Sequence, residues 1–137
     1  VIPNSKVAYI PNCINNKFEM LEKYPRNILL EKSGFDKLGI SQNDKILLYL
    51  GRFHKGKNVD LIVKAWVEIR KFVKDNNWHL CLVGDGNEKS KIINLSRDFP
   101  FKEFNWHISH PLFDEEKYCA YYSSNGFILS SNSKLFY

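Results

Sequence analysis

Positive side chains gather directly after an apolar run near the middle of the chain. Arg52, Lys55 and Lys57 follow Gly51 within six positions, and the apolar run before them spans residues 46–50. A short apolar run that ends in glycine is typical of a strand buried on both faces of a sheet. The residues after Lys57 have the pattern of a helix, so this basic turn between a strand and a helix predicts a binding site for an anion.

The same turn has part of a P-loop pattern. Gly51, Gly56 and Lys57 have the spacing of G-x-x-x-x-G-K-[ST], in which backbone N–H groups cradle phosphates. Asn58 takes the place of the hydroxyl residue that binds Mg²⁺ in that pattern, and the residues between the two glycines are large. Because the backbone of a phosphate cradle must approach its ligand closely, small residues are favoured there. Nucleotide hydrolysis by a P-loop-like protein is therefore the less favoured alternative.

A second glycine turn, Gly84-Asp85-Gly86, follows the apolar run 79–83. It lacks the third glycine of a dinucleotide-binding fingerprint, because Lys89 stands at that position. Taken alone, this turn could be purely structural. Ligands of parallel sheets bind outside the carboxyl ends of the strands, however, and both glycine turns follow predicted strands. The two turns are therefore expected to border one crevice.

Strands and helices must alternate to position these turns. Strands are predicted at 46–50, 79–83, 104–108 and 126–129, and helices at 58–75, 88–97 and 114–122. The helix 58–75 repeats apolar residues in steps of three and four, with Asn58 as its N-cap. On the later helices the residues expected to face inward are Ile92, Ile93, Leu95, Tyr118 and Tyr121. This alternation predicts an α/β fold, a Rossmann-like parallel sheet with helices on both faces.

The first third of the chain has a weaker pattern. Two Pro-Asn pairs favour extended or turning backbone, and a short strand is expected at 6–10. Between residues 17 and 44, charged residues, Pro25 and Gly34 interrupt any long period. We therefore expect two parts: an interdomain linker and lead-in segment with local helix at 1–44, and a Rossmann-like domain at 45–137.

The composition limits the classes of partner. The chain of 137 residues carries 20 Lys and Arg against 15 Asp and Glu, a net charge of +5. This excess suits a polyanionic ligand, an acidic membrane surface or nucleic acid. Nucleic acid is the weakest of the three, because the basic residues are not interleaved with aromatic residues. No stretch approaches the roughly 18 apolar residues of a membrane span.

Cysteine and histidine usage argues against a disulfide framework and a metal site. The three cysteines, Cys13, Cys81 and Cys119, form no C-x-x-C pair, and Cys81 lies inside an apolar run. None of the four histidines has the spacing of a zinc motif. We expect no metal, a buried thiol at Cys81 and a reducing, cytoplasmic setting.

Five segments in order resemble the donor-binding half of GT-B glycosyltransferases of the group 1, or family 4, type. They are Gly51-Arg52 with Lys57, residues 60–65, residues 82–86, residues 128–131, and Pro11-Asn12-Cys13-Ile14-Asn15 followed by Phe18. The resemblance covers roughly residues 9–131 and implies the C-terminal, Rossmann-like half of a GT-B fold.

The resemblance also implies roles for particular residues. Arg52 and Lys57 would bind the diphosphate of a nucleotide-sugar and stabilise the charge on the leaving nucleotide, which makes them the candidate catalytic residues. The donor-binding residues would be Gly51, Gly84, Asp85, Gly86 and Ser131. The donor would be a UDP- or GDP-sugar used by a hexosyltransferase in glycan, lipopolysaccharide or glycolipid synthesis, with no prosthetic group and no metal.

The end of the chain departs from the family pattern. Lys134 stands where the family has a glutamate, and the chain stops at Tyr137, before the position of a second glutamate. We therefore expect a donor-binding domain truncated at its C-terminus, inactive alone and completed by an N-terminal acceptor-binding domain. The expected location is the cytoplasm, with peripheral attachment at the inner face of the membrane as an alternative. A non-catalytic nucleotide-binding module is the main alternative.

Overall fold

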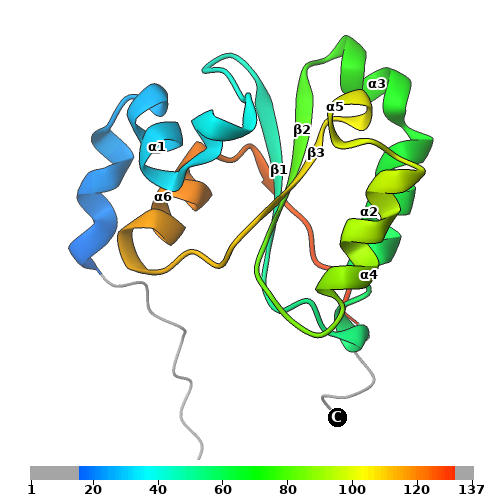
Figure 1. Ribbon diagram of the computed structural model, residues 1–137. Helices are drawn as coiled ribbons and strands as arrows, with labels where there is room; N and C mark the ends of the chain where they lie inside the picture. The colour runs from blue at the N-terminus through cyan, green and yellow to red at the C-terminus, as the bar shows by residue number, and fades with distance from the viewer. Residues whose placement is uncertain (1–15, 132–137) are drawn as a thin grey trace, which may run out of the picture.

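The computed structural model describes residues 16–131 as a four-stranded sheet with helices on both faces (Figure 1). The strands are β1 (Lys45–Leu50), β2 (Trp78–Val83), β3 (Trp106–Ser109) and β4 (Gly126–Phe127). The α-helices are α1 (Arg26–Ser33), α2 (Val59–Glu68), α3 (Arg70–Asp75), α4 (Lys89–Asn94), α5 (Phe101–Phe104) and α6 (Asp114–Ser123). Four 3₁₀ helices complete the described elements: η2 (Asn16–Lys23), η3 (Phe35–Leu38), η4 (Lys55–Lys57) and η5 (Leu95–Arg97).

All strand pairs in this sheet are parallel, in the order β3-β2-β1-β4. The central register places Leu47 of β1 opposite Leu80 of β2, and Leu80 opposite Trp106 of β3. Parallel strands are connected by crossovers that place helices on the faces of the sheet, so central strands are apolar on both sides. The predicted α/β fold, Rossmann-like with helices on both faces, is confirmed.

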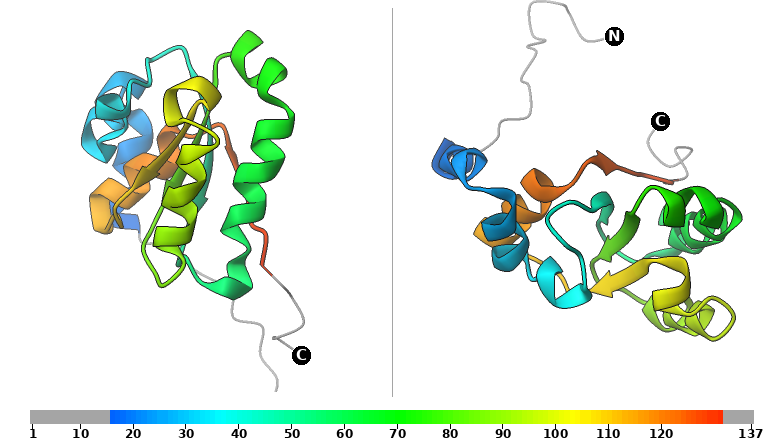
Figure 2. Two further views of the ribbon diagram at one scale, coloured as in Figure 1. Left: turned by 45° about the vertical axis from the view of Figure 1, so that its right-hand side comes forward. Right: turned by 90° about the horizontal axis from the view of Figure 1, so that it is seen from above.

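The two faces of the sheet hold two separate cores. Tyr49, Leu80 and Leu82 pack with α2, α4 and α5, whereas Leu48 and Cys81 pack with α1 and α6. Neighbouring residues of a strand point to opposite faces, which explains the division. Figures 1 and 2 show the two helical layers, with α1 and α6 on one side and α2 to α5 on the other.

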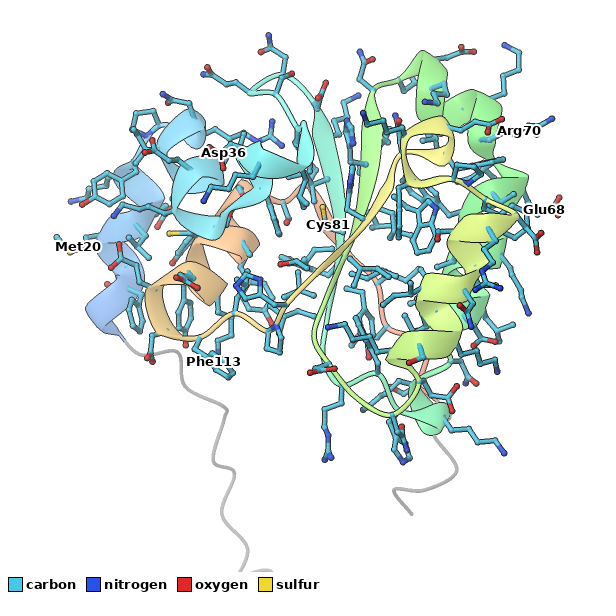
Figure 3. All side chains as sticks on the ribbon, viewed as in Figure 1. Met20, Asp36, Glu68, Arg70, Cys81 and Phe113 are labelled. Atoms are coloured by element: carbon cyan, nitrogen blue, oxygen red, sulfur yellow. The ribbon has the colours of Figure 1, made fainter. Side chains whose placement is uncertain are left out.

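Cys81 lies at the centre of the molecule (Figure 3). Its side chain is fully buried, as the sequence predicts, and burial raises the pKa of its thiol. A buried thiol that keeps its proton is a poor nucleophile. Cys81 therefore serves packing.

The stretch predicted as one helix at 58–75 is wrong in one respect, because it is broken at Ile69 into α2 and α3. Ile69 has φ −103°, ψ 21° and is 48% exposed, although its spacing had placed it on the apolar stripe. The break turns Ile69 to solvent and still leaves Trp66 and Val73 buried. The apolar period of the sequence predicts one continuous helix. Burial of Trp66 before the break and Val73 after it stabilises the fold more than an unbroken helix would.

The region before β3 also differs from the prediction of a strand at 104–108. Pro100 precedes the short helix α5, and Asn105 then adopts a left-handed conformation, with φ 51°, before β3 begins at Trp106. Asparagine tolerates this conformation better than most residues. The strand therefore begins two residues later than predicted and ends one residue later, at Ser109.

Two predictions of inward-facing residues are wrong. Ile93 of α4 is 40% exposed and Tyr121 of α6 is 37% exposed. On α6 the buried residues are the small Cys119, Ala120 and Ser123, which face α1. Small residues allow two helices to approach closely, so the bulky tyrosines lie at the margins of this contact.

Residues 16–44, expected as a linker with local helix, are helical and contribute to the core. Leu30, Phe35 and Ile40 are buried against the sheet, and Phe18 stacks on Tyr118 of α6 with ring centroids 4.5 Å apart. The division into segments 1–44 and 45–137 stays a prediction about the whole protein. The predicted strand at 6–10 and Lys134 fall outside the described residues.

Candidate functional site

The two glycine turns meet at the carboxyl edge of the sheet, as the sequence predicts. The N–H of Gly51 donates to the carbonyl of Val83 at 3.0 Å, and the N–H of Phe53 donates to the carbonyl of Asp85 at 2.9 Å. The carbonyl of Phe53 accepts from the N–H of Glu88 at 2.9 Å. The exits of β1 and β2 are therefore joined backbone to backbone.

Gly84 and Gly86 are required by this contact between the turns. A Cβ on Gly84 would lie 1.8 Å from the carbonyl oxygen of Gly51, and a Cβ on Gly86 would lie 2.4 Å from that of Phe53. The φ angles of 153° and 157° also disfavour a side chain. The two glycines thus have a structural role whether or not a ligand also approaches them.

Phe53 anchors the turn that carries Arg52. Its ring is fully buried and lies 6.2 Å from the ring of Tyr49, whose hydroxyl donates to the carbonyl of Arg52 at 2.7 Å. Burial raises the pKa of Tyr49, so the phenol keeps its proton and remains a donor. From the sequence, Phe53 is expected only as a bulky loop residue. The signal that could have identified it is an apolar ring between charged neighbours.

Arg52 is held by this anchor with its side chain exposed. Its guanidinium makes no hydrogen bond or ion pair with any residue in the described range 16–131. An arginine whose backbone is fixed and whose side chain has no protein partner there is suited to bind an anion in two-point contact.

Lys57 ends a tight turn with its own fixed backbone. In η4, the N–H of Gly56 donates to Nδ1 of His54 at 3.2 Å, and the N–H of Lys57 donates to the carbonyl of His54 at 2.9 Å. Asn58 follows in a left-handed conformation, with φ 50°. The amino group of Lys57 has no ion pair within the part of the chain that the structure describes.

Asn58 does not cap α2 with its side chain, contrary to the prediction. Its Nδ2 donates instead to the carbonyl of Ser130 at 3.0 Å, while the hydroxyl of Ser130 donates to the carbonyl of Lys57. The segment that leads there from β4 is tied to β1, because the N–H of Ile128 donates to the carbonyl of Leu48 at 2.9 Å. Ser131, which is exposed, follows directly after this contact with the basic turn.

A cavity of about 300 Å³ opens beside the two turns. The segment after β3 and the start of α6 complete its wall, which consists of Leu50, Gly51, Arg52, Val83, Gly84, Asp85, Pro111, Leu112, Phe113 and Lys117. Four predicted site residues, Gly51, Arg52, Gly84 and Asp85, thus line one cavity. Gly86, Lys57 and Ser131 do not line it.

The sequence interpretation missed Phe113 and Lys117 as neighbours of this cavity. Phe113 comes from the segment between β3 and α6, and Lys117 comes from α6 itself, far along the chain from the glycine turns. A second cation beside Arg52 raises the affinity of the cavity for an anion. Phe113, which is 71% exposed, offers an aromatic surface at its rim.

The structure argues against a P-loop. In a P-loop the backbone N–H groups of the turn point at phosphates. Here the N–H groups of Phe53, Gly56, Lys57 and Asn58 donate to protein acceptors, namely Asp85 O, His54 Nδ1, His54 O and Lys55 O. The phosphate cradle that the spacing of Gly51 and Lys57 had suggested is therefore not formed.

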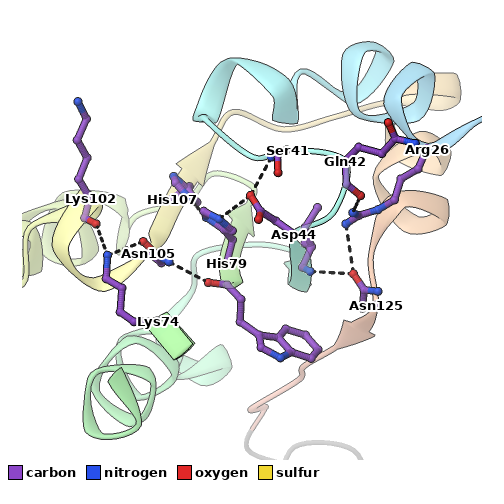
Figure 4. Close-up of polar contacts among 12 residues, drawn as sticks. Arg26, Ser41, Gln42, Asp44, Lys74, His79, Lys102, Asn105, His107 and Asn125 are labelled. Atoms are coloured by element: carbon purple, nitrogen blue, oxygen red, sulfur yellow. Dashed lines mark hydrogen bonds and ion pairs between the residues drawn. The ribbon is translucent and has the colours of Figure 1, made fainter. Parts of the chain in front are cut away.

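A second polar cluster lies at the amino end of the strands (Figure 4). Nε2 of His79 is 3.2 Å from the Asp44 carboxylate, and Nδ1 of His79 is 2.9 Å from Nε2 of His107. Burial lowers the pKa of both imidazoles, that of His107 to about 4, where His79 adds to the effect. No group of three or more His, Cys, Asp or Glu residues within 16–131 is placed to hold a metal.

Family comparison agrees with this arrangement. The model of the family described as "Glycosyl transferases group 1" matches residues 31–136. The chain belongs to this family. The glycosyltransferase chain is 29% identical over 103 residues to N-acetyl-alpha-D-glucosaminyl L-malate synthase of Bacillus anthracis, covering 75% of this chain and 24% of the relative. It therefore spans about a quarter of the length of that curated relative.

Solved glycosyltransferase structures have the same fold as this glycosyltransferase chain. The pneumococcal O-GlcNAc transferase GtfA, in complex with UDP and GlcNAc, matches with a TM-score of 0.56 and 20% identity over 67% of this chain and 17% of that one. WaaG, a glycosyltransferase involved in lipopolysaccharide biosynthesis, matches with a TM-score of 0.55 and 23% identity over 79% and 28%. The GT-B resemblance read from the sequence is confirmed. None of the described helices is long and apolar enough to cross a membrane.

Proposed function

We propose that this chain is the donor-binding part of a glycosyltransferase that uses a nucleotide-diphosphate sugar. The observation that carries the proposal is the cavity at the carboxyl edge of the sheet, where Arg52 is exposed without a partner in the described range and Lys117 adds a second positive charge. Ligands of open parallel sheets bind at this edge. The relative GtfA was solved with UDP and GlcNAc, which supports a nucleotide sugar as the ligand.

Arg52 and Lys57 would act on the leaving group. Breaking the bond between sugar and diphosphate leaves negative charge on the nucleotide, and fixed cations stabilise that charge more in the transition state than in the bound donor. Arg52 can contact two phosphate oxygens at once, while Lys57 supplies a movable point charge. Since Lys57 lies outside the lining of the cavity, its side chain would reach the diphosphate from the neighbouring turn.

The other predicted donor contacts fall into two groups. Gly51, Gly84 and Asp85 line the cavity, so we propose that they contact the nucleoside. Gly86 and Ser131 lie outside the lining, and Gly86 is explained by its contact with Phe53. We keep Ser131 as a proposed donor contact because it follows Ser130, which binds the backbone of Lys57.

Thermal stabilisation by a nucleoside diphosphate tests the proposal. A ligand at a hundred times its Kd stabilises the folded state by about 2.7 kcal/mol, so UDP or GDP should raise the Tm. Arg52→Ala should remove most of the shift, because a hydrogen-bonded contact with a charged group contributes about 1.5–3 kcal/mol to binding. Arg97→Ala, an equally exposed arginine in η5, is the control and should keep the shift. No shift with either nucleotide at millimolar concentration would refute donor binding, and the larger shift would identify the base.

A non-catalytic nucleotide-binding module is the second candidate, because Lys134 replaces a family glutamate. Release of UDP or GDP from a nucleotide sugar by the longest natural form of the protein would rule this candidate out. The acceptor-binding domain, the pathway and a location at the cytoplasmic face of a membrane are proposals for that longer protein. Sedimentation with vesicles that contain anionic lipid tests the last of these, since the net charge of +5 favours such a surface.

A further inference from the structure

His54 accepts hydrogen bonds from the last two residues of η4, the three-residue turn that ends in Lys57. Its Nδ1 accepts from the N–H of Gly56 at 3.2 Å, and its carbonyl accepts from the N–H of Lys57 at 2.9 Å. An imidazole nitrogen can accept a hydrogen bond only through a lone pair, so the contact assigns the ring proton to Nε2. His54 therefore acts as the N-cap of η4 in its neutral form.

Protonation of His54 would remove this cap. A protonated imidazole carries N–H groups on both nitrogens, so Nδ1 would present a donor to the donor of Gly56. Histidine is the side chain that ordinarily changes its charge between pH 5 and 8. A turn capped by an imidazole lone pair is thus sensitive to pH in a way that one capped by an amide oxygen is not.

We propose that His54 is a positioning residue: its neutral ring fixes the turn that presents Lys57, and its protonation releases that turn. The proposal deepens the proposed function, because it assigns pH-dependent control of donor binding to a residue outside the lining of the donor cavity. His54 lines instead a smaller cavity of about 130 Å³.

The charges that face His54 are balanced. Lys55 from η4, Asp60 from α2, and Glu88 and Lys91 from the start of α4 line the same small cavity. The carboxylates are already paired with Lys91, Asp60 at 3.6 Å and Glu88 at 3.8 Å. Because these neighbouring charges balance, the hydrogen bond from Gly56 is the specific interaction that depends on the protonation of the His54 ring.

The competing role for His54 is a direct contact with phosphate as a cation. The two roles predict opposite effects of acid. If the ring binds phosphate, protonation strengthens donor binding, whereas if the neutral ring caps the turn, protonation weakens it. The hydrogen bond from Gly56 to Nδ1 favours the second role.

Hydrogen exchange of the Gly56 amide tests the cap without any ligand. The full chain would be compared with His54→Asn, whose side-chain oxygen can accept at an N-cap, and with His54→Ala, which cannot. Relative to the intrinsic exchange rate, protection of Gly56 in the wild type should fall about fivefold from pH 7.5 to pH 5.5, the size of one lost cap. Protection should persist in His54→Asn and be low in His54→Ala at both pH values. Equal protection in all three proteins would overturn the proposal.

Calorimetric titration with UDP and with GDP tests the consequence. The Kd of the wild type should rise about fivefold more than that of His54→Asn between pH 7.5 and pH 5.5. The nucleotide itself is protonated in the same pH range, and the comparison with His54→Asn cancels the effect of that protonation on the Kd. A wild-type Kd that falls relative to the variant would show a cationic phosphate contact and sink the positioning role. If no form binds either nucleotide, the proposed function fails, and the Gly56 exchange decides the role of His54 by itself.

Discussion

Replacing Gly84 by alanine should push apart the two turns that form the candidate site. The new Cβ would lie 1.8 Å from the carbonyl oxygen of Gly51, which is 1.2 Å less than the 3.0 Å limit below which Cβ atoms essentially never approach another atom. The obstacle is a backbone atom, so no side-chain rotation can relieve the contact. Either the β1 exit or the β2 exit must move by more than 1 Å.

The cost of Gly84→Ala can be worked out from the contacts that such a movement disrupts. The hydrogen bonds from Gly51 to Val83 and from Phe53 to Asp85 join the two exits directly, and each contributes about 1 kcal/mol net. A Cβ at φ 153° adds about 1–2 kcal/mol of backbone strain. The free energy of unfolding should therefore fall by about 3–4 kcal/mol.

Urea unfolding followed by circular dichroism would measure this loss. Gly39→Ala is the matched control, because Gly39 also has a positive φ, 82°, but a Cβ there would meet no atom within 4 Å. The control should lose only the backbone term, about 1–2 kcal/mol. If Gly84→Ala loses no more than Gly39→Ala, the close approach of the turns does not constrain this site, and the structural explanation of Gly84 is wrong.

Two further predictions concern the anchor of the turn and the amino end of the sheet. Phe53→Ala should lower the free energy of unfolding by about 3–5 kcal/mol, because it empties a fully buried site. The control Phe72→Ala, at a side chain that is 58% exposed, should lower it by under about 1 kcal/mol. Equal losses of stability in thermal melts of the two variants would contradict the role of Phe53 as an anchor. The lowered pKa of His107, about 4, means that the unfolded chain binds a proton that the folded chain excludes as pH falls below about 6.5. The wild type should therefore lose about 2 kcal/mol more than His107→Gln between pH 7 and pH 4.5 in urea unfolding, and parallel pH profiles would refute this assignment.

Much of the candidate site can be predicted from the sequence because it depends on local features. The apolar runs that end at Gly51 and Gly84 define β1 and β2 within one residue. Parallel strands bring their carboxyl ends to one edge, so two glycine turns after two strands must be neighbours or nearly so. The basic residues of the first turn, and the order of the motifs, were sufficient to indicate the family.

The parts that could not be predicted depend on contacts between distant segments. Phe53 has the sequence context of a loop residue, and only the core beneath the turn shows that it anchors Arg52. Asn58 has the properties of a helix cap, yet its side chain donates a hydrogen bond to the carbonyl of Ser130, 72 residues away. Lys117 joins the cavity from α6, which no local pattern relates to the glycine turns.

By itself, the sequence determined the α/β class, the place of the basic turn and the family, because periodicity, glycine positions and charge act over a few residues. The tertiary structure decided what those residues do in the fold. It showed that Gly84 and Gly86 are needed where two backbones meet, and that the backbone N–H groups of Phe53, Gly56, Lys57 and Asn58 are already bonded within the protein. A backbone N–H group can bind a ligand only if no acceptor of the protein lies within hydrogen-bonding distance. Which acceptors lie that close is decided by the folded chain alone.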